Sequence, residues 1–203
     1  KSAERVRYLI SSLRASKLTP EQSHALSQMR MDNRKAQDPF RASKLWSDVA
    51  HRFDREFHYM GVGDVESRYF NLRFSGFAAG DQRLHGYLVY MYFQKLRERD
   101  KYGLLNSIST NLPVQTGLAY QIDGCKVSLD LLFSIDEFYS LIEIRPDLMT
   151  TKSAIIADLG AGWGRLGYVL KKANPNITYV VFDLPEVLLI SSTYLPTVLP
   201  GHA

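Results

Sequence analysis

The chain has 203 residues, of which 45% are hydrophobic and 12% aromatic, values that exclude a disordered protein and suit one core or two small ones. Its 25 basic and 21 acidic side chains give a net charge of +4 and are mixed along the sequence, so they indicate no nucleic-acid partner. A single cysteine excludes an internal disulfide, and we find neither a long apolar run nor an apolar leader. We therefore expect a cytoplasmic protein with no membrane span.

Residues 1–105 are expected to form a mainly helical region that serves as a cap, a substrate-binding region or a dimerisation region. Thr19, Pro20 and Gln22 have the pattern of a capped helix start, and this helix should run to about residue 36. Other helices are expected over residues 3–14, 43–59, 64–80 and 83–99. The many aromatic side chains of this region suit a core or a subunit interface, and they could also provide a platform for a sugar ring.

Loop-favouring residues are concentrated over residues 104–117, so we place the domain boundary between residues 105 and 106. The pair Asp123-Gly124 separates two alternating segments and predicts a β-hairpin, because both residue types tolerate positive φ. Ser128 is then placed to cap a helix that runs to about Ile144, where an Arg-Pro pair ends it.

The most informative stretch begins at residue 153. In order it contains an apolar strand closed by Asp158, a turn with Gly160, Gly162 and Gly164, a helix from about Arg165, a second strand over residues 178–182, and Asp183. This order is typical of a nucleoside-binding site at the carboxyl edge of a parallel sheet. Glycines let the backbone approach a ligand, and an acid about 20 residues further on can accept hydrogen bonds from both ribose hydroxyls.

Two classes of cofactor fit this spacing. Gly162, Gly164 and Gly167 satisfy the G-x-G-x-x-G pattern of dinucleotide-binding sites. A carboxylate at Asp158, however, would lie close to a pyrophosphate docked on the turn, and like charges there cost energy. S-adenosylmethionine instead brings an ammonium and a sulfonium, which a carboxylate attracts. The charge pattern therefore favours S-adenosylmethionine over a nicotinamide or flavin cofactor.

The stretch Asp158-Leu-Gly-Ala-Gly-Trp-Gly164 resembles the first motif of class I S-adenosylmethionine-dependent methyltransferases. Residues 179–196, which include Phe-Asp-Leu-Pro-Glu and Tyr-Leu-Pro, resemble the second strand and following helix of the sugar O-methyltransferase family found in polysaccharide and natural-product gene clusters. Residues 111–114 and the helix from Ser128 resemble the lead-in of the same family. The resemblance implies an α/β, Rossmann-like class I methyltransferase fold, here truncated, behind the helical N-terminal region.

The resemblance also implies a set of cofactor-binding residues: Asp158, Gly160, Ala161, Gly162, Gly164, Asp183 and Leu184. Of these, Asp158 and the turn would line the methionine end, Asp183 would hold the ribose, and Leu184 would pack near the adenine. Arg165 replaces a small residue of the family pattern; it either faces the substrate or starts the helix, and we favour the second interpretation.

The implied activity is S-adenosylmethionine-dependent methylation of a sugar hydroxyl on a small-molecule or glycan acceptor. Residues 106–203 would supply the first half of the cofactor domain. The family's later strands, which usually carry the catalytic base, are missing after Asp183. We therefore assign no catalytic residue and expect the sequence to be a fragment or the ordered part of a longer protein.

Two other functions stay open: methylation of a phenolic or other non-sugar hydroxyl, and a noncatalytic assembly module with a vestigial cofactor fold. The helical N-terminal region could mediate a homo-oligomer in either case. No metal site is expected, since the five histidines are scattered without ligand spacing. Packing or surface roles suit them better than catalysis, although His58 and His85 could reach a substrate. Cys125 is interpreted as a packed residue rather than a nucleophile.

Overall fold

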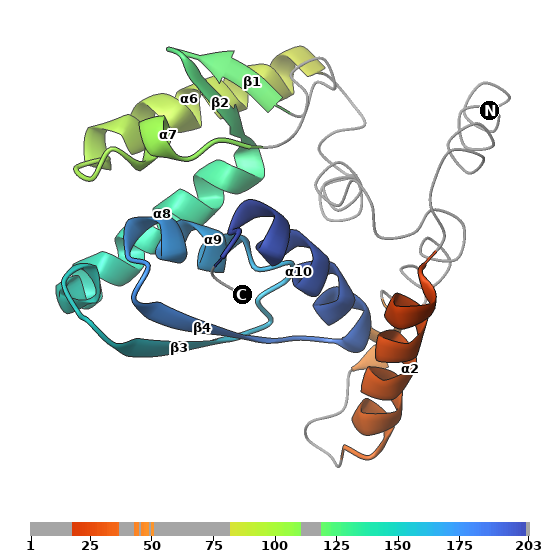
Figure 1. Ribbon diagram of the computed structural model, residues 1–203. Coiled ribbons are helices and arrows are strands. Elements are labelled where there is room, and N and C mark those ends of the chain that lie inside the picture. Colours follow the sequence, from red (N-terminus) through yellow and green to blue (C-terminus); the bar gives the residue numbers. More distant parts are fainter. Residues whose placement is uncertain are drawn as a thin grey trace, which may run out of the picture. The chain divides into compact units, whose positions relative to one another are not determined.

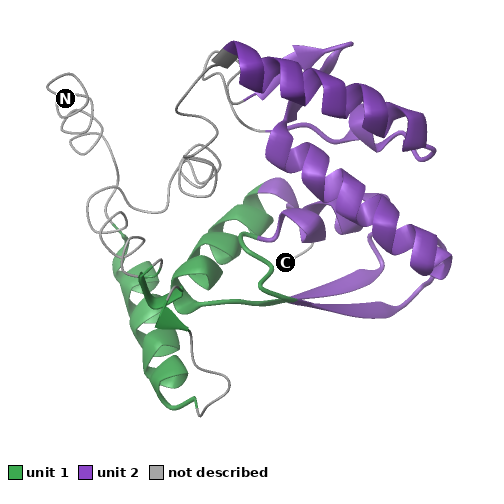
Figure 2. Cartoon of the chain, turned by 180° about the vertical axis from the view of Figure 1, so that it is seen from behind, with its two compact units in different colours: residues 1–63, 159–163, 181–197 green, residues 64–158, 164–180, 198–203 purple. Residues whose placement is uncertain are grey.

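The computed structural model describes residues 18–36, residues 43–50 except 45 and 49, residues 82–110 and residues 119–201 (Figure 1). These residues form both helices and strands, so the chain is a mixed α/β protein. It divides into two compact units (Figure 2): unit 1 comprises residues 1–63, 159–163 and 181–197, and unit 2 comprises the remainder. The expected domain boundary after residue 105 stays a prediction.

Several expected helices fall partly or wholly outside the described residues. The helices over residues 3–14 and 64–80 lie outside them entirely. Of the helix expected over residues 43–59, the described positions from Lys44 to Ala50 are helical. Among the described residues, no helix is both long enough and apolar enough to cross a membrane.

In unit 1, helix α2 (Pro20–Arg34) begins as the sequence predicts. The Thr19 hydroxyl accepts a hydrogen bond from the Gln22 amide at 3.2 Å, and the Gln22 side chain accepts one from the Thr19 amide at 3.0 Å. This reciprocal capping box satisfies two amides that have no partner within the helix. The prediction of a capped helix is therefore confirmed.

Helix α10 spans Pro185–Val198 and is the helix that the resemblance places after the second strand. Pro196 lies inside the helix, two residues before its end, and its missing amide hydrogen removes one helical hydrogen bond. In the first turn, the buried Glu186 accepts a hydrogen bond from Nε of Arg30 at 2.7 Å. This ion pair attaches α2 to α10 within unit 1.

Unit 2 is organised around helix α8 (Leu129–Ile144). The Ser128 hydroxyl accepts a hydrogen bond from the Leu131 amide at 3.3 Å, and the helix stops before the short 3-10 helix η2 (Pro146–Met149), so both expected ends are confirmed. The buried face of α8 comprises Leu131, Leu132, Ile135, Phe138 and Ile142. This face contacts helices α6 and α9 of the same unit.

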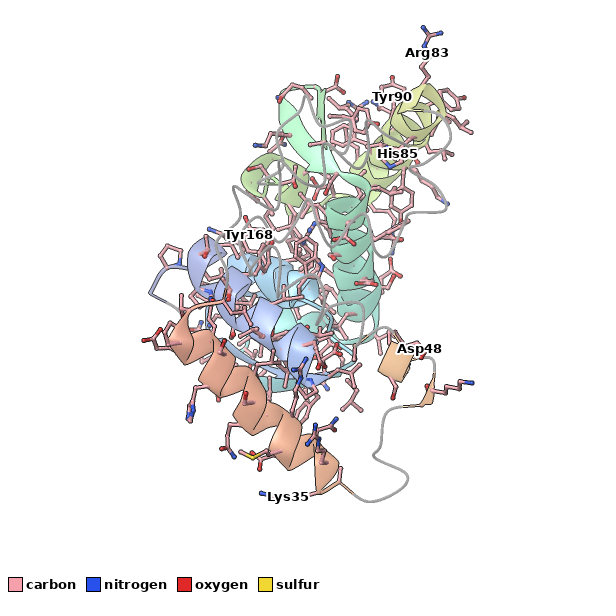
Figure 3. The ribbon with its side chains drawn as sticks, turned by 90° about the vertical axis from the view of Figure 1, so that its right-hand side faces the viewer. Lys35, Asp48, Arg83, His85, Tyr90 and Tyr168 are labelled. Atoms are coloured by element: carbon pink, nitrogen blue, oxygen red, sulfur yellow. The ribbon has the colours of Figure 1, made fainter. Side chains whose placement is uncertain are left out.

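Helix α6 (Gln82–Arg99) confirms the helix expected from residue 83. It buries Val89, Phe93 and Leu96, while Leu84, Tyr87, Tyr90 and Met91 are among its exposed side chains. Figure 3 labels Arg83, His85 and Tyr90 on this helix. The helix therefore has one face in the core and a second, aromatic-rich face that is exposed within the described residues.

The expected hairpin is also present in unit 2, as strands β1 (Ala119–Ile122) and β2 (Cys125–Ser128) paired in antiparallel register. Ile122 lies opposite Cys125, and the two turn residues Asp123 and Gly124 have φ of 48° and 82°. Positive φ at both positions is what a type I′ turn requires.

The prediction of a loop over residues 104–117 is wrong for its first four residues. Leu104–Ser107 form the short helix α7, because both carboxylate oxygens of Asp100 accept backbone hydrogen bonds there, from Leu104 at 2.8 Å and Leu105 at 3.0 Å. Burial of the two leucines adds to this local stabilisation. Residues 111–117 lie outside the described residues.

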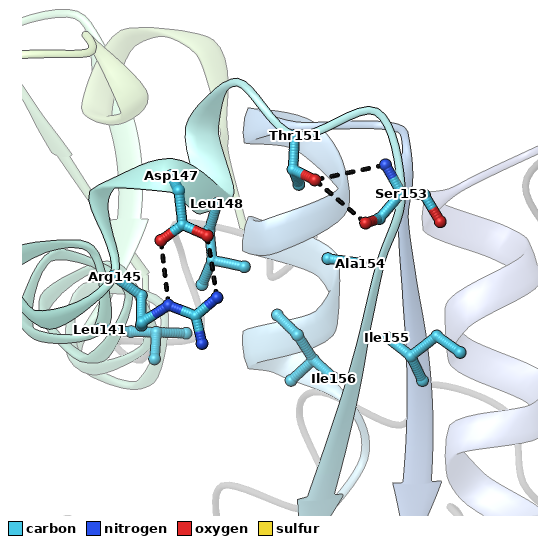
Figure 4. Close-up of a pocket in the computed structure, with 9 residues that line it drawn as sticks. All are labelled: Leu141, Arg145, Asp147, Leu148, Thr151, Ser153, Ala154, Ile155 and Ile156. Atoms are coloured by element: carbon cyan, nitrogen blue, oxygen red, sulfur yellow. Dashed lines mark hydrogen bonds and ion pairs between the residues drawn. The ribbon is translucent and has the colours of Figure 1, made fainter.

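Strand β3 (Ala154–Leu159), helix α9 (Arg165–Ala173) and strand β4 (Ile177–Phe182) follow in the expected order. The two strands pair with each other, and Figure 4 shows that they run in the same direction. Parallel strands joined through a helix form the β-α-β unit on which nucleoside-binding folds are built.

Candidate cofactor site

The turn that follows β3 consists largely of glycines with positive φ. Gly160, Gly162 and Gly164 have φ of 78°, 60° and 87°. This backbone region costs a residue with a β-carbon about 1–2 kcal/mol. A β-carbon placed on Gly160 or Gly162 would meet no other atom within 4 Å. The backbone conformation, rather than crowding, therefore requires glycine here, and the space beside these two α-carbons is open among the described residues.

Asp183, the residue after β4, is hydrogen-bonded to this turn within unit 1. The Gly162 amide donates to Oδ2 of Asp183 at 2.7 Å, and the Leu184 amide donates to Oδ1 at 2.7 Å. Beside them the Gly160 amide donates to the carbonyl oxygen of Phe182 at 2.8 Å. The structure thus brings together two parts of the predicted site.

Trp163 anchors the glycine turn, a role that the sequence analysis missed. Its side chain is only 2% exposed, and its ring centroid lies 5.0 Å from that of Tyr194 in α10. A large aromatic side chain between two glycines was the available signal, because such a residue gains most of its stabilisation by burial.

Asp158 has a different partner. It is the penultimate residue of β3, and its Oδ2 accepts a hydrogen bond from the Tyr179 hydroxyl on the adjacent strand β4. Burial, and then the hydrogen bond to Asp158, raise the pKa of Tyr179 well above its usual value. The phenol therefore keeps its proton at neutral pH and acts as a donor. The sequence analysis gave Tyr179 no role.

Arg165 starts helix α9 and is buried at 3% exposure. Its Nη2 lies 2.9 Å from Oδ2 of Asp130 in the first turn of α8, and both side chains are less than 10% exposed. This burial supports the favoured interpretation that Arg165 starts the helix rather than facing a substrate.

The other predicted site residues occupy the turn or its continuation. Gly164 is the residue immediately before α9, Ala161 is half-buried in the turn, and the carbonyl of Leu184 accepts a hydrogen bond from the Leu188 amide in α10. Their contacts with a cofactor stay predictions.

A cavity of about 430 Å³ lies elsewhere in unit 2, at the beginning of β3 (Figure 4). The Arg145 guanidinium there donates two hydrogen bonds to Asp147, at 2.9 and 2.8 Å, and the Thr151 hydroxyl bonds the Ser153 backbone. These polar groups already have partners, and the cavity adjoins the amino end of the strand. Ligands of open α/β sheets bind at the carboxyl ends, so we do not assign the cofactor to this cavity.

The described histidines and the cysteine that were considered for catalysis are either buried by packing or exposed on the surface. His85 is buried, with Nδ1 2.7 Å from the Tyr120 hydroxyl, and His24 is exposed on α2. His58 lies outside the described residues. Burial, together with the charges of Asp123 and Asp100, raises the pKa of the Cys125 thiol, which is unfavourable for a nucleophile. Within the described ranges, no group of His, Cys, Asp and Glu side chains could hold a metal ion.

Comparisons of the chain with family models, with curated proteins and with solved structures found no match.

Proposed function

We propose that the glycine turn and Asp183 form the nucleoside-binding edge of an S-adenosylmethionine site in a Rossmann-like class I methyltransferase fold. The activity we propose is O-methylation of a sugar hydroxyl. The observation that carries the proposal is the hydrogen bond from the Gly162 amide to Asp183, because it joins the turn after one parallel strand to the acid after the next.

The chemistry of these residues fits the cofactor. The space beside the α-carbons of Gly160 and Gly162 is open, and Asp183 directly follows the second strand, where an acid can accept hydrogen bonds from ribose hydroxyls. Asp158, two residues before Gly160, brings a carboxylate that would repel a pyrophosphate and attract an ammonium group. This difference in charge favours S-adenosylmethionine over a dinucleotide.

When bound, S-adenosylmethionine supplies an activated methyl group. The chain's own contribution is to bind and orient: Asp183 would hold the ribose, Asp158 and the glycine turn the amino-acid end, and Leu184 would pack near the adenine. Alignment of the methyl donor with an acceptor hydroxyl would supply most of the rate enhancement, and a general base would take the hydroxyl proton. We assign that base to no described residue.

The acceptor class rests on the resemblance of residues 110–200 to sugar O-methyltransferases, with a phenolic hydroxyl as the alternative. We further propose a cytoplasmic location, because a single cysteine suits a reducing compartment. A homo-oligomer would use the helical N-terminal region, where α6 exposes Tyr87 and Met91.

The test is equilibrium binding of S-adenosylhomocysteine, the product form of the cofactor, to the 203-residue chain and its variants. Asp183→Ala should weaken binding at least about tenfold, which corresponds to 1.4 kcal/mol. Asp48→Ala, which removes an exposed carboxylate in the N-terminal region (Figure 3), is the matched control and should bind normally. Unchanged affinity in a folded Asp183→Ala protein would contradict the site. Transfer of labelled methyl groups to sugars or phenols then identifies the acceptor.

A further inference from the structure

The ring of Tyr179, a residue of β4, packs against helix α9 at Gly167 within unit 2. A β-carbon at position 167 of α9 would overlap the Tyr179 ring, so the close approach of helix and strand requires Gly167. Gly167 is the third glycine of the formal dinucleotide pattern, and close helix–strand packing is the general role of that position. Its presence here is explained by the tyrosine ring rather than by a phosphate.

The ring's position fixes the direction in which its hydroxyl points. That hydroxyl donates to Oδ2 of Asp158 on the neighbouring strand. A carboxylate that accepts this bond cannot rotate freely, and its second oxygen, Oδ1, is not used by the bond. The burial that keeps the phenol protonated makes Tyr179 a donor throughout the neutral pH range.

We propose that Tyr179 is a positioning residue that orients the Asp158 carboxylate to bind the ammonium group at the amino-acid end of the ligand. The inference rests on the proposed function, since it concerns the same site. An ammonium group carries three donors and a full charge, so a carboxylate held in one orientation binds it better than a freely rotating one. The nucleoside end of the ligand would not depend on this contact.

The test compares two ligands that differ only at the amino-acid end. S-adenosylhomocysteine carries that end, whereas methylthioadenosine has the same nucleoside and sulfur without it. Tyr179→Phe keeps the ring against Gly167 and removes only the hydroxyl. It should weaken S-adenosylhomocysteine binding about threefold to tenfold, the range expected for one hydrogen bond, and leave methylthioadenosine binding unchanged.

Asp158→Asn provides the second arm of the experiment. It should weaken S-adenosylhomocysteine binding more than Tyr179→Phe does, and the double variant should bind no worse than Asp158→Asn, because Tyr179 acts through Asp158. Tyr87→Phe, which removes an exposed hydroxyl in the same unit, is the control and should bind both ligands normally.

Equal weakening of both ligands by Tyr179→Phe, or losses that add in the double variant, would overturn the positioning role while leaving the cofactor site intact. If the unmodified chain bound neither ligand, the proposed function itself would fail, and the positioning role with it. Normal S-adenosylhomocysteine binding by Tyr179→Phe would overturn the positioning role alone.

Discussion

The Gly162 amide donates a hydrogen bond to Oδ2 of Asp183 at 2.7 Å, across 21 positions of the chain. The bond places the acid that follows β4 directly on the turn that follows β3. Two features that are separate in the sequence thus form one element of structure.

Replacing Gly162 by alanine should destabilise the protein by about 1–2 kcal/mol, because its φ of 60° is unfavourable for a residue with a β-carbon. Gly124→Ala is a matched control: that hairpin glycine has φ of 82°, and a β-carbon there also meets no atom within 4 Å. Urea unfolding should show similar losses for both variants. Only Gly162→Ala should weaken S-adenosylhomocysteine binding, and an equal effect of Gly124→Ala on binding would contradict the role of the turn.

Removing the guanidinium of Arg165 should destabilise the protein by about 3–5 kcal/mol, because Asp130 would remain as a buried charge without its ion-pair partner. Combining Arg165→Met with Asp130→Leu should cost less than Arg165→Met alone, since neither charge then remains. Denaturant unfolding measures the loss of stability in Arg165→Met and in the double variant. A loss below 1 kcal/mol in Arg165→Met, together with weaker substrate binding, would instead favour the substrate-facing interpretation.

Breaking the Arg30–Glu186 ion pair between α2 and α10 should destabilise the protein less than removing the guanidinium of Arg165. Arg30→Ala should cost about 1–2 kcal/mol, less than a fully buried pair, because the Arg30 side chain is 30% exposed while that of Glu186 is 7% exposed. Arg34→Ala removes an exposed arginine from the last turn of the same helix and should leave stability nearly unchanged. Equal unfolding midpoints for the two variants would show that the ion pair does not stabilise unit 1.

The lone thiol offers a pH-dependent test. Burial raises the pKa of Cys125 above its ordinary value of 9.0, so the folded state favours the protonated thiol. The stabilisation of the folded protein by the protonated thiol is present below pH 9.0 and is lost as the pH rises through the folded-state pKa of Cys125. At pH 8, alkylation of the native protein should be about tenfold slower or more than alkylation of the urea-unfolded chain. Equal rates would mean that the thiol is accessible and reactive.

Local signals in the sequence predicted the elements well. Thr19 with Gln22 predicted the capped start of α2, Asp123-Gly124 predicted the hairpin, and Ser128 predicted the start of α8. Each of these features depends on residues within a few positions of one another. The short helix α7 was missed because its cap, Asp100, precedes a stretch whose composition favours a loop.

The candidate site was predictable only in part. The pattern of glycines and acids predicted which residues would matter, and the structure brings Gly162 and Asp183 together. The partners of Asp158 and Arg165 could not be predicted, because Tyr179 and Asp130 are distant in sequence and meet them only through the packing of neighbouring strands and helices. Side-chain contacts of this kind depend on tertiary structure rather than on local pattern.

Calorimetric titration of the 203-residue chain with S-adenosylhomocysteine, with NADH as the comparison ligand, tests the central claim most directly. We predict micromolar binding of S-adenosylhomocysteine and no measurable binding of NADH. Binding of NADH alone would show that the glycine turn serves a dinucleotide, and binding of neither ligand would contradict a cofactor site and favour the noncatalytic assembly module.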